Sequence, residues 1–406
     1  MMKTPKGLRL HIAIFGRRNV GKSTLLNALT EQNVSIVSDV AGTTTDPVEK
    51  PLELLPLGPV LFIDTAGIDD KGGLGALRIE KTKKIFDRAD FALLVVEAEC
   101  FGKYEEDIVS QLDAKKIPFI VVVNKTDICI PSKSFVKKLG NYKYLLCSSL
   151  SGDGIPDLKK MLIANVPDDW INPPTLAGDL IETGRSAVLV IPIDLEAPKG
   201  RLILPQVQVI RELLDNDCIA VVVKERELGC AIDNMSEKPK IVITDSQAVL
   251  KVCADVPYDI KVTTFSILFA RYKGDLRTFV DGVFTFDDLK DGDKVLIGEA
   301  CSHHAIADDI GTVKIPRWVR QYTGKNIIFE KYSGHDFPEN LKEYRLIVHC
   351  GSCMINRREV LNRIVQAKSQ GVPITNYGVA ISYLQGVLKR AVEPFPSVSY
   401  LINQRK

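Results

Sequence analysis

An α/β fold class, divided among three successive domains, is predicted for this chain. Short apolar runs typical of strands alternate with longer helix-like stretches, an order that favours parallel sheets with helices on both faces. The length of 406 residues exceeds the roughly 250–300 residues at which single cores stop growing. A proline-rich segment near residue 170 ends the first domain, because a helix cannot continue through Pro167, Pro173 and Pro174.

The first predicted domain, residues 1–170, has the clearest alternation of elements. We expect strands over 11–15, 60–64, 91–98, 117–125 and 144–149, and helices over 20–30 and 77–86. This order predicts a parallel sheet with helices on both faces.

The second predicted domain, residues 177–266, contains apolar strands but no chemical motif. We expect a hairpin over 187–204, a helix over 207–215, and strands over 218–224, 240–245 and 260–265. Its apolar content predicts a module for packing or association.

The third predicted domain, residues 267–406, is again α/β in pattern. We expect strands over 294–298, 326–330, 345–349 and 372–375, and helices over 355–369 and 377–392.

Composition and charge narrow the function classes. The net charge is only +2, without a basic stripe, so we expect no nucleic-acid partner. The first apolar run, residues 12–15, is too short for a signal peptide or a membrane span, so we expect a cytoplasmic protein. Nine cysteines in such a chain favour reduced thiols or metal ligation over disulfides, and the six isolated ones read as small buried hydrophobes.

A phosphate-binding loop is predicted between the first strand and the first helix. The stretch reads GRRNVGKS over residues 16–23, which is the GxxxxGK[ST] pattern in its strand-to-helix context. Backbone N–H groups of such a loop wrap the phosphates, Lys22 would meet the β and γ oxygens, and the Ser23 hydroxyl would hold Mg²⁺.

Further motifs complete a GTP site. Asp64 ends a strand and begins DTAG, which would place its carboxylate near Mg²⁺ and the Gly67 N–H near the γ-phosphate. In NKTD, the Asp127 carboxylate can accept from the N1 and amino donors of guanine, which adenine lacks. The switch threonine is one of Thr43, Thr44 and Thr45, with Thr44 as the assigned ligand.

The predicted site residues share the roles just described. Catalysis is assigned to Lys22, Thr44, Asp64 and Gly67; Mg²⁺ to Ser23, Thr44 and Asp64; and GTP binding to Gly16, Asn19, Gly21, Lys22, Ser23, Thr24, Asn124, Lys125, Asp127, Ser148 and Ser149.

These motifs resemble the TrmE-like branch of the Ras-type GTPases over about the first 165 residues. The resemblance implies a P-loop GTPase fold. Ile68 stands where Ras has its water-orienting glutamine, so intrinsic hydrolysis should be slow. Members of the branch compensate with K⁺ held partly by an asparagine of the phosphate loop, and Asn19 has the matching position; the alternative role is a loop-capping asparagine.

Three cysteines in the third domain suggest a metal centre. The chain reads CSH from Cys301 and HCGSC over residues 349–353, so Cys301 and Cys350 each follow a predicted strand and Cys353 is expected to begin a helix. Carboxyl ends of parallel strands converge, so one pocket could gather the three sulfurs. An iron–sulfur cluster, a structural zinc and unligated thiols all fit the ligand type. Candidates for a fourth ligand are the histidines His303, His304 and His349, while Asp308 or Asp309 could offer an oxygen.

Together with the GTPase motifs, these CxH and HCxxC motifs resemble the HydF family, maturation GTPases of [FeFe]-hydrogenase, over the whole chain. The resemblance implies a homodimer with GTPase, dimerisation and cluster-binding domains. It makes Cys301, Cys350 and Cys353 ligands of a [4Fe–4S] cluster. It also implies a diiron precursor as cargo, the radical-SAM enzymes HydE and HydG as partners, and apo [FeFe]-hydrogenase as recipient.

A rival interpretation is a TrmE-like RNA-modification or ribosome-assembly GTPase with a structural zinc. It predicts nucleic-acid contacts, which the nearly neutral charge disfavours. A plain regulatory GTPase would leave the three cysteines unexplained.

Overall fold

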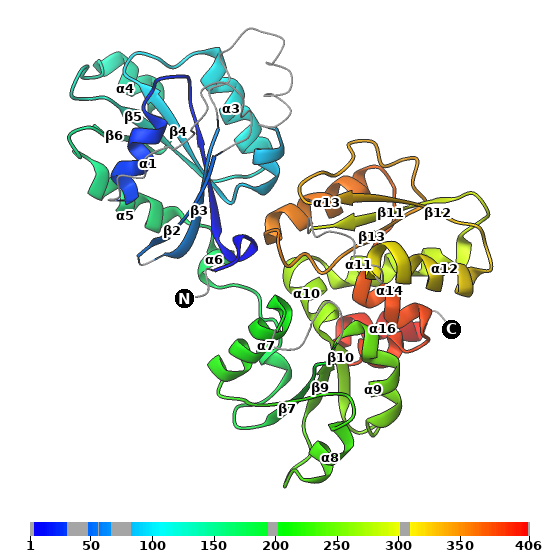
Figure 1. Cartoon of the computed structure of the whole chain (residues 1–406). Helices are drawn as coiled ribbons and strands as arrows, with labels where there is room; N and C mark the ends of the chain where they lie inside the picture. Colours follow the sequence, from blue (N-terminus) through cyan, green and yellow to red (C-terminus); the bar gives the residue numbers. More distant parts are fainter. Residues whose placement is uncertain are drawn as a thin grey trace. The chain divides into compact units, whose positions relative to one another are not determined.

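The computed structural model describes residues 4–30, 48–55, 57–65, 83–193, 202–300 and 309–404. The chain forms two compact units, Met1–Pro173 and Pro174–Lys406. Figure 1 draws the first from blue to green and the second from green to red.

The first unit contains a six-stranded sheet in the order β2-β3-β1-β4-β5-β6. Its strands are β1 (Leu10–Phe15), β2 (Val48–Leu54), β3 (Gly58–Asp64), β4 (Phe91–Glu97), β5 (Phe119–Asn124) and β6 (Tyr144–Leu146). All neighbours pair in parallel except β2 and β3, which are antiparallel. The sequence pattern did not predict β2.

Helices cover both faces of this sheet, as expected. They are α1 (Lys22–Thr30), α3 (Lys103–Ala114), α4 (Lys133–Leu139), α5 (Ile155–Asn165) and α6 (Asp168–Ile171), together with helical residues 83–88, the described end of the region where a helix over 77–86 was expected. Alternate residues of β1 enter two separate cores: Ile12 and Ile14 pack with α1 and α5, while Ala13 and Phe15 pack with α3 and α4. A strand buried on both faces is the reason for its continuous apolar run.

The second unit begins with a four-stranded parallel sheet in the order β10-β9-β7-β8. Its elements are β7 (Ser186–Val190), α7 (Leu204–Asp215), β8 (Ile219–Val223), α8 (Leu228–Asp233), β9 (Ile241–Thr244), α9 (Val249–Asp255) and β10 (Lys261–Thr264). The hairpin expected over 187–204 is wrong. β7 lies between β8 and β9 and pairs in parallel with both, and α7 begins at Leu204, the last residue of the expected hairpin, with Pro205 in its first turn.

A second parallel sheet follows in the order β12-β11-β13-β14. Its strands are β11 (Lys294–Glu299), β12 (Ile328–Ser333), β13 (Leu346–His349) and β14 (Ile374–Asn376). The helices are α10 (Phe265–Lys273), α11 (Leu276–Val283), α12 (Ile315–Thr323), α13 (Arg357–Ser369), α14 (Tyr377–Leu384), α15 (Leu388–Ala391) and α16 (Pro396–Gln404). The single helix expected over 377–392 is divided between α14 and α15, and Gly386 between them has a φ of 74°.

Both sheets of the second unit share one hydrophobic core. Helix α10 contacts α7 and β10 on one side and α13 and α14 on the other, so it lies between the two sheets (Figure 1). The segment that joins the sheets in sequence is therefore also the structural bridge between them.

The described helices are short. The longest of them, α13, has 13 residues, whereas a membrane-spanning helix needs about 20 apolar ones. None of the helices in the described ranges combines the length and apolar character that a bilayer crossing requires.

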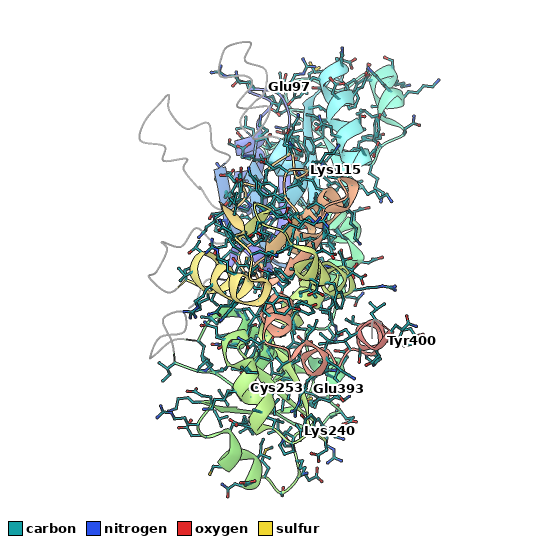
Figure 2. All side chains as sticks on the ribbon, turned by 90° about the vertical axis from the view of Figure 1, so that its right-hand side faces the viewer. Glu97, Lys115, Lys240, Cys253, Glu393 and Tyr400 are labelled. Atoms are coloured by element: carbon teal, nitrogen blue, oxygen red, sulfur yellow. The ribbon has the colours of Figure 1, made fainter. Side chains whose placement is uncertain are left out.

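The isolated cysteines divide into two groups. Cys147, Cys218 and Cys253 are buried, as expected for small hydrophobes, and Figure 2 labels Cys253 on α9. The prediction of burial is wrong for the exposed ones, which are Cys100, Cys129 and Cys230. Burial raises the pKa of the Cys147 thiol to about 12, so this thiol stays protonated.

Candidate functional site

The phosphate loop connects β1 to α1 through two glycines that no larger residue could replace. A Cβ on Gly16 would lie 2.3 Å from the Val95 carbonyl oxygen, and one on Gly21 would lie 2.4 Å from Nδ2 of Asn124. Both glycines have positive φ, 147° and 91°. The loop backbone therefore packs directly on β4 and on the end of β5, which leaves its N–H groups for a ligand.

Lys22 and Asp64 lie where the motifs predict a magnesium and phosphate site. Nζ of Lys22 donates to the carbonyls of Gly16 and Arg17 at 2.8 and 2.7 Å. The Ser23 hydroxyl donates to Oδ2 of Asp64 at 3.2 Å. Burial raises the pKa of Asp64, and the Lys22 ammonium opposes this shift.

One oxygen of this carboxylate is suited to binding a cation. Oδ1 of Asp64 is buried and has no hydrogen-bond partner in the described part of the chain. An unpartnered buried carboxylate oxygen next to a serine hydroxyl suits a hard cation such as Mg²⁺, so the residues fit that ion. The predicted residues Thr44 and Gly67 lie outside the described residues, as do Thr43 and Thr45.

Asn124 joins the phosphate loop to the base-side loop. Its Nδ2 donates to the Val20 carbonyl at 2.9 Å, and its Oδ1 accepts from the backbone N–H and the hydroxyl of Ser149 at 3.0 and 2.8 Å. Ser148 is also buried, and its hydroxyl accepts from the Ser151 N–H at 3.1 Å. This connection holds β5, the phosphate loop and the serine loop in fixed relation.

The other predicted GTP-binding residues face solvent to different degrees. Asp127 is exposed in the turn after β5, where its carboxylate is accessible to a base. Lys125 forms an ion pair with Glu97, which lies at the end of β4. Figure 2 labels Glu97. Thr24 and Asn19 are exposed, and Asn19 has a φ of 64°, a left-handed conformation that asparagine tolerates better than most residues.

Sequence reasoning missed an ion pair that supports the phosphate loop. Nε and Nη2 of Arg17 donate to the two carboxylate oxygens of Glu105 on α3 at 2.7 and 2.9 Å, and Glu105 is fully buried. The Arg17 guanidinium also lies 5.4 Å from the centre of the Tyr104 ring. The ion pair and the ring contact hold Arg17 in place, and the Arg17 carbonyl accepts a hydrogen bond from Nζ of Lys22. The partners are 88 positions apart, so no local pattern indicates the pair.

Residues 350–356, which connect β13 to α13 and carry Cys350 and Cys353, form a loop that we call the cysteine loop. It lies at the carboxyl ends of β11, β13 and β14. In register, Gly298 of β11 and Asn376 of β14 both lie opposite His349 of β13. Cys350 follows directly. Cys353 does not begin a helix as expected, because it lies in a turn and α13 starts at Arg357, with the Asn356 side chain as its cap.

The sulfur of Cys350 accepts two backbone hydrogen bonds. The donors are the N–H groups of Ala300 at 3.1 Å and Ser352 at 3.4 Å. Burial raises the pKa of the Cys350 thiol to about 11, with Cys353 as the next cause, while these N–H groups oppose the rise. Two amide donors aimed at a sulfur suit a metal-bound thiolate, which carries the negative charge that the amides stabilise, so this donor set fits an iron–sulfur ligand.

Both ring nitrogens of His349, a candidate fourth ligand, are already engaged. Nδ1 lies 3.0 Å from the Cys350 carbonyl oxygen, and Nε2 lies 2.9 Å from Nη1 of Arg363, which is a donor only. Burial, and next the Arg363 charge, lowers the pKa of His349 to about 3, so the ring is neutral. Arg363 is in turn paired with Glu359 at 2.7 Å.

The remaining predicted ligands, Cys301, His303 and Asp308, lie outside the described residues. Among the residues that the structure does describe, no three His, Cys, Asp or Glu side chains gather closely enough to hold a metal ion. Ala300, the neighbour of Cys301 in sequence, is one of the two described residues whose N–H groups donate to the Cys350 sulfur.

Family models match three consecutive parts of the chain. Residues 11–125 match a model described as a 50S ribosome-binding GTPase. Residues 176–274 match the hydrogen maturase F dimerization domain, and residues 277–394 match the hydrogen maturase F tetramerization domain. The chain belongs to the HydF family. Its GTPase domain is of the TrmE-like type, and the α/β fold class predicted from the sequence is confirmed.

Curated proteins with GTPase in their names are similar to part of this HydF chain. GTPase Der of a Nitratiruptor species is 43% identical over 130 residues, which are 31% of this chain and 28% of that protein. The tRNA modification GTPase MnmE of Aquifex aeolicus is 36% identical over 167 residues, 40% of this chain and 36% of that protein. The matches thus span only 28% and 36% of those relatives' own length.

Two solved structures show a limited similarity to the HydF chain. Aquifex aeolicus Era bound to GDP and aluminium fluoride is 23% identical, with a TM-score of 0.34, and the match covers 53% of this chain and 93% of Era. The G domain of the T. maritima FeoB iron transporter is 21% identical, with a TM-score of 0.31, and the match covers 38% of this chain and 98% of that domain.

For the HydF chain, three conclusions follow from the family and the geometry. It is a HydF-type GTPase with a P-loop domain, and this domain implies GTP and Mg²⁺ as ligands. Its two further matched domains are of types that support oligomerization.

Proposed function

We propose that this chain hydrolyses GTP and carries a [4Fe–4S] cluster on which a diiron precursor is assembled, or from which it is delivered, for an apo [FeFe]-hydrogenase. The cluster ligands are Cys301, Cys350 and Cys353. One observation carries the metal proposal: the N–H of Ala300, next to Cys301, donates to the Cys350 sulfur at 3.1 Å, so the two cysteine segments meet at one sheet edge. The cluster, when bound, supplies an iron that protein sulfur does not saturate, as a place for cargo.

His349 is proposed as a support for the cysteine loop and not as the fourth ligand. Its Nδ1–H donates to the Cys350 carbonyl, and its Nε2 accepts from Arg363. A ring so oriented positions the ligand-bearing backbone, as partners around metal ligands commonly do. His303 and Asp308 stay as the candidates for that position.

For hydrolysis, Lys22 would leave the Gly16 and Arg17 carbonyls and bind the β and γ phosphate oxygens. Ser23 and Asp64 would hold Mg²⁺, which when bound neutralises charge on these oxygens. Thr44 and Gly67 are assigned to the γ-phosphate side. The Asp127 carboxylate would read guanine, and Asn124 would keep the loops in place.

Asn19 is proposed as a K⁺ ligand because it has the position of the asparagine that holds this ion in TrmE-like GTPases. It is exposed on the phosphate loop, with a φ of 64°. We expect hydrolysis to be at least about tenfold faster in KCl than in NaCl, since a fixed cation at the phosphates stabilises the charge that develops there. Turnover measured at equal ionic strength checks this. The variant Asn19→Ala should lose the potassium response, and equal rates in both salts for the unaltered chain would contradict the assignment.

The homodimer is proposed to form along β8. This strand is an edge of its sheet, and its Ile219 and Val222 side chains are 55% and 47% exposed. The other edge strand, β10, contacts α15. An apolar edge strand that no other described strand pairs with, within the dimerization-type segment, suits strand pairing with a second copy.

A charge on this edge should separate the subunits. We expect Val222→Lys to halve the particle mass measured by light scattering during size-exclusion chromatography, since a lysine on an edge strand blocks pairing. Val365→Lys, on an exposed site of α13, is the matched control. An unchanged mass for Val222→Lys would place the interface elsewhere.

The proposed delivery of the diiron precursor is tested by measuring its transfer from this chain to apo [FeFe]-hydrogenase. The chain would be produced together with the radical-SAM enzymes HydE and HydG, purified without oxygen, and mixed with apo [FeFe]-hydrogenase. We expect hydrogen evolution to appear with the unaltered chain and not with Cys350→Ala. If the chain never activates the apo-hydrogenase, the carrier role falls. The rival, a GTPase acting on RNA with a structural zinc, would then gain support from bound zinc.

A further inference from the structure

Lys273 is an unusual buried lysine beside the cysteine loop. It ends α10 and is only 1% exposed. Lysine is almost never fully buried unless its ammonium is partnered, because desolvating the charge is costly. The partners of this ammonium therefore show why it is there.

Two of those partners are main-chain carbonyls of the cysteine loop. Nζ of Lys273 donates to the Ser352 oxygen at 2.8 Å and to the Ile355 oxygen at 2.6 Å. These carbonyls flank Cys353 on both sides in sequence. Ser352 has a φ of 59°, a conformation that costs free energy unless its surroundings hold it. The ammonium is such a support.

The same helix holds the loop at a second point. The Ser266 hydroxyl of α10 lies 3.1 Å from Oδ1 of Asn376, whose Nδ2 donates to the Cys350 carbonyl at 3.3 Å. α10 also contacts α7 of the first sheet of this unit. The loop that carries Cys350 and Cys353 is thus anchored to the helix that bridges the two sheets.

We propose that Lys273 is the positioning residue of the cysteine loop and, together with Arg363, a local counter-charge of the cluster bound there. The counter-charge part rests on the proposed cluster; the positioning part does not. Thiolate ligation leaves a [4Fe–4S] cluster with a net negative charge, which increases when dithionite, a one-electron reductant, adds an electron. A buried ammonium next to the loop stabilises the more negative, reduced form.

The test compares Lys273→Met and Lys273→Arg with the unaltered chain, and uses Lys325→Met, an exposed lysine of the same unit, as the control. After anaerobic reconstitution with iron and sulfide, the midpoint potential is measured by dithionite titration followed by electron paramagnetic resonance. We expect Lys273→Met to weaken reduction about tenfold, which is about 59 mV more negative for one electron. Lys273→Arg and the control should stay within about twofold of the unaltered chain.

A second readout needs no iron. In the metal-free chain, amide hydrogen exchange of residues 351–355 should be at least about tenfold faster in Lys273→Met and unchanged in Lys325→Met. Unchanged exchange and an unchanged potential would overturn the proposal. A changed potential with unchanged exchange would remove the positioning role, and the reverse would remove the counter-charge role.

Two outcomes separate this proposal from the proposed function. If the unaltered chain takes up no cluster, the proposed function fails, the counter-charge role falls with it, and hydrogen exchange decides the positioning role. If only Lys273→Met fails to take up iron, the midpoint potential of the cluster in Lys273→Arg decides whether Lys273 acts as a counter-charge. A midpoint potential of Lys273→Arg equal to that of the unaltered chain supports the counter-charge role. A change in this potential that corresponds to a tenfold shift in reduction overturns that role.

Discussion

Replacing Lys22 with methionine should lower GTP turnover by at least about 100-fold, the cost typical of losing one group that stabilises transition-state charge. The ammonium already lies within the phosphate loop, where the Gly16 and Arg17 carbonyls hold it. Phosphate release from GTP under saturating Mg²⁺ measures the effect. Methionine keeps the length and apolar stem of the side chain, so the loss reports on the charge.

Two further measurements show that this loss is specific. Lys133→Met, an exposed lysine on α4, should turn over GTP like the unaltered chain. Iron uptake by Lys22→Met should also be unchanged, because the cysteine loop belongs to the other compact unit. Turnover retained within tenfold in Lys22→Met would contradict the role given to this residue.

Replacing Cys350 with alanine should reduce bound iron at least about tenfold, since even the loss of a group that only supports a metal ligand costs roughly 10–100-fold. It removes the sulfur at which the Ala300 and Ser352 N–H groups point. Iron per chain after anaerobic reconstitution is the measurement. Cys301→Ala and Cys353→Ala should behave in the same way.

The control for this loss is Cys253→Ala, a buried cysteine of the same unit on α9, which should bind iron normally. GTP turnover should stay within about twofold in all four variants, because the motifs for hydrolysis are in the first unit. If Cys350→Ala also abolished hydrolysis, the assignment of the two activities to separate units would be wrong.

Much of the fold was predictable because its strands are buried on both faces. Continuous apolar runs such as those of β1, β5 and β13 are typical of strands inside a parallel sheet, and the glycine-lysine loop has a fixed place between a strand and a helix. The prediction failed where pairing depends on distant chain segments. β2 pairs antiparallel at an edge, and β7 pairs with β8 and β9 in place of a hairpin.

In the candidate site, too, local sequence motifs predict some residues, whereas contacts between distant segments determine others. Side chains that act through a local motif, such as Lys22 and Cys350, are visible in the sequence. The residues that position them are not. Glu105 is 88 positions from Arg17, and Lys273 is 79 positions from Ser352, whose carbonyl it binds. Since that partner is a main-chain atom, no residue type in the loop indicates the contact.

The most direct test of the central claim is the metal content of the unaltered chain, reconstituted without oxygen and analysed for iron, sulfide and zinc together with its visible spectrum. We predict about four iron and four sulfide ions per chain and a brown protein with broad absorption near roughly 400 nm. A colourless protein with about one zinc per chain and no sulfide would contradict the account, because four thiolate or imidazole ligands around one ion describe a structural zinc site and not a cluster carrier.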